Sequence, residues 1–144
     1  DHPRQHHLRI AQARVSVRAR VVAVPAVLGA IAVFDHRVRR RVGALVVVEK
    51  AIISTGYNGT PMGVANCSDG GCPRCASDAP PGAGYDTCVC VHAEQNAIVM
   101  AARHGNATNG GVLYATLRPC FGCAKESIQA GIQRLRMNAL CVSV

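Results

Sequence analysis

The sequence predicts an α/β fold in which helices cover a mixed β-sheet. Two apolar segments rich in β-branched residues, 44–48 and 51–55, have the length of strands, and Glu49-Lys50 between them suits a tight antiparallel turn. Two helical segments and two further strands follow along the chain. The order strand–strand–helix–strand–helix–strand is typical of a sheet between layers of helix, so we expect a three-layer α/β/α sandwich.

The elements of the second half are predicted from periodicity and from their stop signals. In chain order, we expect a helix at 92–103, a strand at 112–116, a helix at 120–130 and a strand at 132–137. His104-Gly105-Asn106 would end the first helix, and Gly131 the second. Residues 62–91 are rich in Gly, Pro, Cys and Asp and predict a long loop, which is uncommon unless the loop is functional or held by a metal.

At 144 residues the chain fits one domain, which we expect to span 35–144. Residues 1–34 are rich in Arg and nearly free of acidic residues. They predict either a first helix, with its arginines on the wet face, or a leader like an organellar transit peptide. The longest apolar run, 21–34, contains Pro25 and Gly29 and is too short to cross a bilayer.

The net charge of +8 is not spread evenly along the chain. Residues 1–41 carry nine Arg and two Asp, a net +7, whereas residues 42–144 carry seven basic and six acidic side chains, a net +1. A protein that grips a nucleic-acid strand needs its basic residues around the active site. The distribution therefore favours a small substrate over a nucleic acid, unless folding brings the leader close to the site.

A metal-binding pattern joins two distant parts of the chain. His92 is followed by Glu94, and Pro119 by Cys120 and Cys123. One histidine and two cysteines give three zinc ligands, which leaves one tetrahedral position for water, as in catalytic rather than structural zinc sites. This H-x-E…P-C-x-x-C pattern is the signature of zinc-dependent nucleobase deaminases. The alternative is a structural Cys/His zinc site or a chance match.

The chemistry of such a site explains the residue types. Pro119 suits the start of a helix, and Cys120 and Cys123 would share one helix face, where the helix dipole favours thiolates. Hydrolytic deamination also needs protons moved from water to a ring nitrogen and to the departing ammonia. Glu94, two residues from His92, is therefore predicted to be the general acid and base rather than a ligand.

With these motifs, the sequence resembles the deoxycytidylate (dCMP) deaminases of the cytidine deaminase superfamily. The resemblance runs from about residue 39 to 134 and includes the segments 54–61, 66–75, 86–98 and 113–132. It implies a cytidine-deaminase type of sandwich, apparently shortened at the C-terminus. It also implies conversion of dCMP to dUMP and ammonia. The metal-like cysteine spacing predicts a reducing compartment, so we expect a cytoplasmic protein, or an organellar one if residues 1–34 act as a transit-like leader.

The resemblance also implies substrate contacts and partners. Asn58 would hydrogen-bond the sugar hydroxyl, the Ala93 N–H would bind the base carbonyl, and Glu94 would engage the ring nitrogen. Arg118, where the family commonly has Ser, would either reach the substrate phosphate or lie in solvent. Family members are often hexamers regulated by dCTP and dTTP, so a homo-oligomer, these effectors and Mg²⁺ with a nucleotide effector are expected possibilities.

The remaining cysteines suggest a second zinc. Cys67, Cys72, Cys75 and Cys88 would form a structural site, with Cys90 as a replacement for one of them, and four thiolates would order the long loop. The alternative is free thiols in a loop shaped by Gly and Pro.

The sequence also leaves two competing functions for the protein. One is a single-stranded DNA or tRNA cytosine or adenine deaminase of the same superfamily, and the other is an inactive structural descendant.

Overall fold

The computed structural model describes residues 17–33, 40–80, 83–84 and 86–137, with side chains described from residue 24 onward. Its centre is a four-stranded sheet of order β2-β1-β3-β4. The strands are β1 (Gly43–Val48), β2 (Ala51–Tyr57), β3 (Val112–Ala115) and β4 (Arg134–Met137). β1 is antiparallel to both β2 and β3, whereas β4 is parallel to β3. The predicted mixed sheet is confirmed.

The predicted turn between the first two strands is also confirmed. Val48 pairs with Ala51, so Glu49 and Lys50 form a two-residue connection. Both have positive φ, 48° and 69°, which is the backbone of the type I′ turn that matches strand twist.

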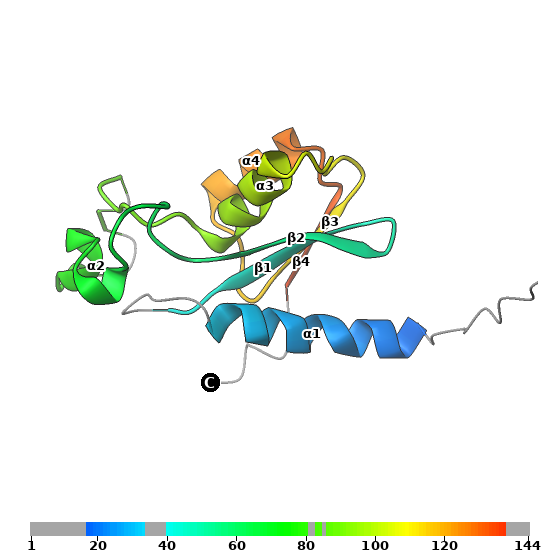
Figure 1. Ribbon diagram of the computed structural model, residues 1–144, viewed down its shortest axis with the longest axis horizontal. Helices are drawn as coiled ribbons and strands as arrows, with labels where there is room; N and C mark the ends of the chain where they lie inside the picture. The colour runs from blue at the N-terminus through cyan, green and yellow to red at the C-terminus, as the bar shows by residue number, and fades with distance from the viewer. Residues whose placement is uncertain (1–16, 34–39, 81–82, 85, 138–144) are drawn as a thin grey trace, which may run out of the picture.

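Helices cover both faces of the sheet (Figure 1). α1 (Val17–Val33) lies on one face, and α3 (Ala93–Arg103) and α4 (Phe121–Gln129) lie on the other. The predicted three-layer sandwich is therefore confirmed. The main core between sheet and helices consists of small and aliphatic side chains, in keeping with the low aromatic content: Val42, Ala44, Val46, Ala93, Ala97, Leu113, Ala115 and Ile132.

Small residues let the helices approach the sheet closely. A Cβ on Gly43 would lie 2.8 Å from the Leu28 carbonyl oxygen of α1. A Cβ on Gly56 would overlap the Ala93 carbonyl oxygen and the Ala97 backbone nitrogen of α3. The first residue of α3, and with it the segment that leads into the helix, is thus fixed against β2 by backbone contact.

Of the two interpretations of residues 1–34, a first helix is what the structure shows for Val17–Val33. Leu28 on α1 is fully buried against the sheet, although Pro25 lies inside the helix. Residues 1–16, and the side chains of Arg18 and Arg20 that were expected to face solvent, lie outside the described part. Among the helices that are described, none is long and apolar enough to span a membrane.

The long predicted loop joins β2 to α3 on the end of the sandwich. Within its described residues the regular structure is limited to two short helices, η1 (Cys67–Asp69) and α2 (Pro73–Ala76). Arg74 is buried, and its guanidinium donates to the carbonyl oxygens of Ala83 and Pro80, at 2.7 Å and 3.4 Å from Nη2. These bonds tie α2 to the rest of the loop.

Candidate metal centre and active site

The first half of the site is built at the start of α3. His92 has extended backbone dihedrals and immediately precedes the helix, so its ring lies at the helix N-terminus. The segment before it is held by two backbone hydrogen bonds between Val91 and Gly59, 2.8 Å and 3.2 Å long. The isolated bridge fixes where the chain enters α3, and therefore where the imidazole points.

The second half is built at the start of α4, as predicted. Cys120 is the N-cap residue, and its sulfur accepts a hydrogen bond from the Cys123 N–H. Cys120 is exposed, whereas Cys123, one turn further into the helix, is buried. Two helix N-termini thus meet at one place, and their partial positive charges favour thiolates there.

The three predicted metal ligands form a compact triangle. The Nδ1 atom of His92 lies 3.5 Å from the Cys120 sulfur and 3.4 Å from the Cys123 sulfur, and the two sulfurs are 3.4 Å apart. Ligand atoms of tetrahedral zinc lie about 3.5–3.8 Å apart, given bonds of about 2.3 Å to sulfur and 2.0–2.1 Å to nitrogen. The donor set therefore fits a zinc ion with a fourth position open.

Electrostatics at this centre also favour a cation. Burial raises the pKa of the Cys123 thiol well above its ordinary value, and the charge of Glu94 and the neighbouring Cys120 raise it further. Burial thus outweighs the helix dipole at Cys123, and this thiol needs a further positive charge to ionise and become a ligand, which zinc would supply. Glu94 lies two residues from His92, so its carboxylate belongs to the same helix start.

Glu94 has the burial expected of a proton carrier. It lies in the first turn of α3 and is only 4% exposed. Its carboxylate makes no hydrogen bond to any other residue within the described part of the chain. A buried carboxylate without a structural partner is costly in a protein interior, which indicates a functional group.

Two of the residues expected to contact substrate, Asn58 and Ala93, contact each other here. Asn58 is buried, and its side-chain Oδ1 accepts the Ala93 N–H at 2.8 Å. This bond orients the amide beside the metal centre and leaves its NH₂ group without a partner among the described residues. The predicted bond from the Ala93 N–H to a base carbonyl would have to replace or share the bond to Asn58, and it stays a prediction.

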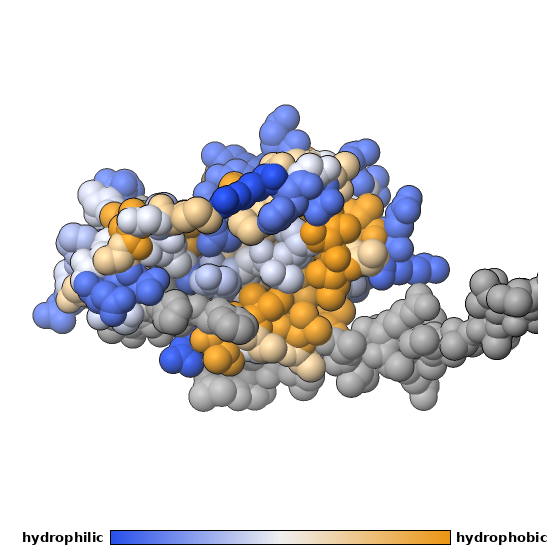
Figure 2. Space-filling view, viewed as in Figure 1, coloured by the Kyte–Doolittle hydropathy of each residue, from blue (hydrophilic) through white to orange (hydrophobic). Residues whose placement is uncertain are grey.

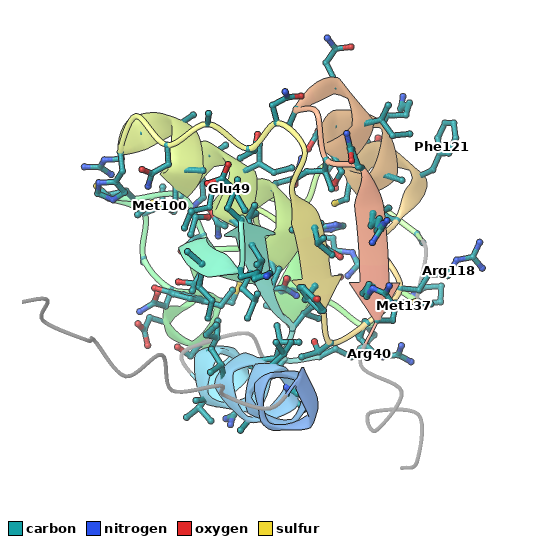
Figure 3. All side chains as sticks on the ribbon, turned by 90° about the vertical axis from the view of Figure 1, so that its right-hand side faces the viewer. Arg40, Glu49, Met100, Arg118, Phe121 and Met137 are labelled. Carbon is teal, nitrogen blue, oxygen red and sulfur yellow. The ribbon has the colours of Figure 1, made fainter. Side chains whose placement is uncertain are left out.

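Arg118 lies in the connection between β3 and α4, and its side chain extends away from the body of the molecule (Figure 3). It is exposed. The position beside Cys120 suits a phosphate contact, and the exposure suits a solvated side chain, so both interpretations remain predictions.

One residue of this site was not predicted from the sequence. Gln95 accepts the His92 N–H through Oε1 at 3.1 Å and donates from Nε2 to the Glu126 carboxylate at 2.9 Å. It therefore links the ligand-bearing end of α3 to α4. The signal was present, because a Gln three residues after a helix N-cap is the second half of a capping box. The link to Glu126 had no sequence signal.

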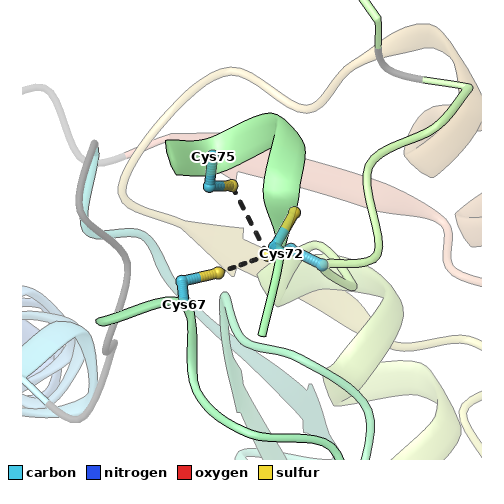
Figure 4. A group of neighbouring side chains, drawn as sticks. Cys67, Cys72 and Cys75 are labelled. Atoms are coloured by element: carbon cyan, nitrogen blue, oxygen red, sulfur yellow. Dashed lines mark hydrogen bonds between the residues drawn. The ribbon is translucent and has the colours of Figure 1, made fainter. Parts of the chain in front are cut away.

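The remaining described cysteines gather in the loop before α3. Four buried sulfur atoms lie within 4.8 Å of one another, those of Cys67, Cys72, Cys75 and Cys90. Figure 4 shows three of them, with their sulfurs turned towards one another. Cys88, which the sequence analysis placed in the first choice of ligands, borders this group at 3.8 Å from Cys72 and 3.9 Å from Cys75.

The fold and the site define a class: an α/β/α sandwich whose two helix N-termini form a three-ligand metal centre beside a buried carboxylate. The sequence matches the family described as the cytidine and deoxycytidylate deaminase zinc-binding region over residues 26–139. The chain belongs to this family.

Individual relatives agree with the family match. The chain is 45% identical over 97 residues to the deoxycytidylate deaminase of Schizosaccharomyces pombe, covering 67% of this chain and 30% of the relative. It is 42% identical over 102 residues to the deoxycytidylate deaminase of Mycobacterium phage D29, covering 67% of this chain and 77% of the relative. The chain thus spans less than a third of the yeast protein.

Solved structures show the same fold. The crystal structure of the dCMP deaminase from cyanophage S-TIM5, in complex with dCMP and dUMP, superposes with a TM-score of 0.64 at 30% identity. The alignment covers 80% of this chain and 77% of that chain.

Proposed function

We propose that this chain catalyses the hydrolytic deamination of dCMP to dUMP and ammonia. The observation that carries the proposal is the triangle of His92 Nδ1 and two thiols, with the buried Glu94 in the first turn of the helix that His92 precedes. A structural zinc site would complete four protein ligands and would need no free buried carboxylate. The similarity to proteins named for dCMP deamination supports the substrate.

Zinc held by His92, Cys120 and Cys123 would supply a Lewis acid that makes water a nucleophile near neutral pH. The chain's own part is proton transfer. Glu94 accepts a proton as the oxygen of water forms its bond to C4 of the cytosine, and it delivers a proton to the adjacent ring nitrogen. It then carries the second proton of the former water to the amino group as the C4–N bond breaks. Ammonia leaves, and the carboxylate is regenerated.

Asn58 would position the nucleotide. Because its Oδ1 is fixed by the Ala93 N–H, the NH₂ group has a set direction and can donate to a sugar hydroxyl. A sugar contact of this kind predicts that a free base is a poor substrate. Among the described residues near Cys120, Arg118 is the one that we propose to contact the substrate phosphate.

The test is a substrate panel for ammonia release with the wild-type chain and Glu94→Gln. Turnover of dCMP, with cytidine and a cytosine-containing oligonucleotide inactive, is the expected result, and Glu94→Gln should be inactive with zinc retained. Turnover of the oligonucleotide alone would establish a nucleic-acid deaminase instead. An inactive wild-type chain with a full complement of zinc would indicate a structural descendant.

Oligomerisation and regulation are separate proposals. We propose a homo-oligomer, hexameric by family resemblance, with dCTP and dTTP as effectors, Mg²⁺ accompanying the effector, and a cytoplasmic location. Exposed apolar side chains support self-association. They lie on α4, β4 and β2: Phe121, Ile128, Met137 and Ile52 are 79%, 71%, 56% and 48% exposed. Figure 2 shows hydrophobic residues gathered along the sheet edge above α1. Light scattering with and without each nucleotide measures both properties.

A further inference from the structure

We propose that Cys67, Cys72, Cys75 and Cys90 bind a second zinc ion, and that this site braces the segment that carries His92. The bracing role rests on the proposed function, because it concerns the metal centre of the deaminase site. The metal site itself does not rest on that function. Its ligand set includes Cys90 in place of Cys88.

The interior of the loop before α3 is built from thiols. Within the described part of residues 62–91, the buried apolar residues are these four cysteines alone, and Cys88 packs against them half-buried. A core of a few thiols offers too little apolar surface to order about thirty residues. Four thiolates around one metal ion provide the missing stabilisation, and burial of all four leaves no open position for water.

The local geometry around Cys72 and Cys75 also suits a metal site. Cys72 and Cys75 flank a tight turn in which the Cys72 carbonyl oxygen accepts the Cys75 N–H at 3.1 Å. The backbone N–H groups of Cys75 and Val89 donate to the Cys72 sulfur. Backbone donors stabilise a thiolate and orient it, as partners of metal ligands do. Gly71 permits this path, because a Cβ there would overlap the Ala65 carbonyl.

The distances between the sulfurs favour Cys90 over Cys88 as the fourth ligand. The Cys90 sulfur lies 3.6 Å from that of Cys75 and 2.7 Å from that of Cys67. Around zinc the shorter distance would open by about 1 Å to a tetrahedral edge of about 3.8 Å. Cys88 adjoins two members of the group, but among the described residues it is not one of the four sulfurs that are all mutual neighbours.

Cys90 connects the cysteine group to the proposed active site. Cys90 precedes His92 by two residues, and Val91 between them is paired with Gly59. Asn58, next to Gly59, holds the Ala93 N–H. Residues 90–93 are therefore fixed to β2's continuation on one side and to the four-thiol group at their start. Loss of the second metal would release the start of this segment, and with it the imidazole and the Asn58 amide.

The experiment uses the full 144-residue chain loaded with zinc, and its readout is metal content by native mass spectrometry. Two zinc ions are expected in the wild type, one in Cys67→Ser, and two in the matched control Cys88→Ser. One zinc in the wild type, or a Cys67–Cys90 disulfide detected by thiol mass, would overturn the proposal. So would loss of zinc in Cys88→Ser with retention in Cys67→Ser.

A second measurement avoids dependence on the folding of variants. Cobalt replaces zinc in the wild type, and the thiolate-to-cobalt charge-transfer absorbance rises with the number of bound thiolates. The titration should proceed in two steps, with four thiolates bound in one site and two in the other. A single step with the absorbance of two thiolates contradicts a second site.

The bracing role has its own readout. Zinc release from the catalytic site to a chromophoric chelator should be about 10-fold faster in Cys67→Ser, the scale on which outer partners change metal affinity. The KM for dCMP should rise with it, and Cys88→Ser should match the wild type. Unchanged release and KM in a Cys67→Ser protein that has lost one zinc would refute the brace. If dCMP is not a substrate, the metal counts and release rates still decide this proposal.

Discussion

The two thiol-bearing centres of this protein differ in ligand number, burial and support. The centre of His92, Cys120 and Cys123 offers three donor residues, one of them exposed, and rests on two helix N-termini above the sheet. The cysteine group of the loop offers four sulfur donors, all buried, and is itself the interior of its segment. An open coordination position and outside support suit chemistry, whereas a closed set without other support suits stability. Similar donor atoms are therefore expected to have different roles because their surroundings differ.

The largest expected effect comes from removing one ligand of the open centre. Cys120→Ser should lower dCMP turnover more than about 100-fold, since even outer partners of metal ligands contribute 10–100-fold. Because Cys120 is exposed and the main core lies elsewhere, the unfolding temperature should change little. Paired assays of turnover and thermal unfolding check this. A large fall in stability would show that the open centre also holds the fold.

Chelation should separate the two centres in time. The open centre should release its zinc to a chelator first, with loss of activity, because Cys120 is accessible to solvent. The buried group should release its metal later, together with local unfolding of residues 62–91. Stopped-flow release followed by proteolysis of the loop measures both steps. Simultaneous release would contradict the distinction between an open and a closed site.

Backbone contact between β2 and α3 is also expected to hold the open centre in place. Gly56→Ala would overlap α3 and should cost about 1–3 kcal/mol of unfolding free energy, as overpacking does. Gly29→Ala on α1 is the matched control, because its Cβ would meet nothing within 4 Å. It should be neutral or stabilising by about 0.5–1 kcal/mol. Urea unfolding of both variants compares them, and equal stabilities would disprove the role of the contact.

The smallest effect should come from the link between the two helices. Gln95→Ala removes the bonds to the His92 N–H and to Glu126, and should cost about 1 kcal/mol, as loss of a helix cap does. Its catalytic zinc should also leave faster. Gln129→Ala, an exposed glutamine on α4, is the control. A double-mutant cycle with Glu126→Ala should show coupling, and strict additivity would argue against the bridge.

The regular elements could be predicted from sequence to within one or two residues. The hairpin follows from two β-branched runs around a two-residue turn, and α3 and α4 follow from periodicity and their stop signals. The grouping of His92, Cys120 and Cys123 was predictable for a similar reason, since their spacing and the Pro before Cys120 are local signals. α1 was less predictable, because Pro25 and an apolar composition obscure its helical pattern.

Sequence alone determined which residue types are available for the chemistry of this protein. These are a histidine and a pair of cysteines at helix starts, a carboxylate two residues after the histidine, and a cysteine-rich loop. Tertiary structure decided which of the loop's sulfurs are mutual neighbours, that Asn58 pairs with Ala93, and that Gln95 reaches Glu126. The physical reason is range. Helix starts, turns and strands are set by neighbours a few residues away, whereas contacts between distant segments depend on how closely Gly43 and Gly56 let the layers pack.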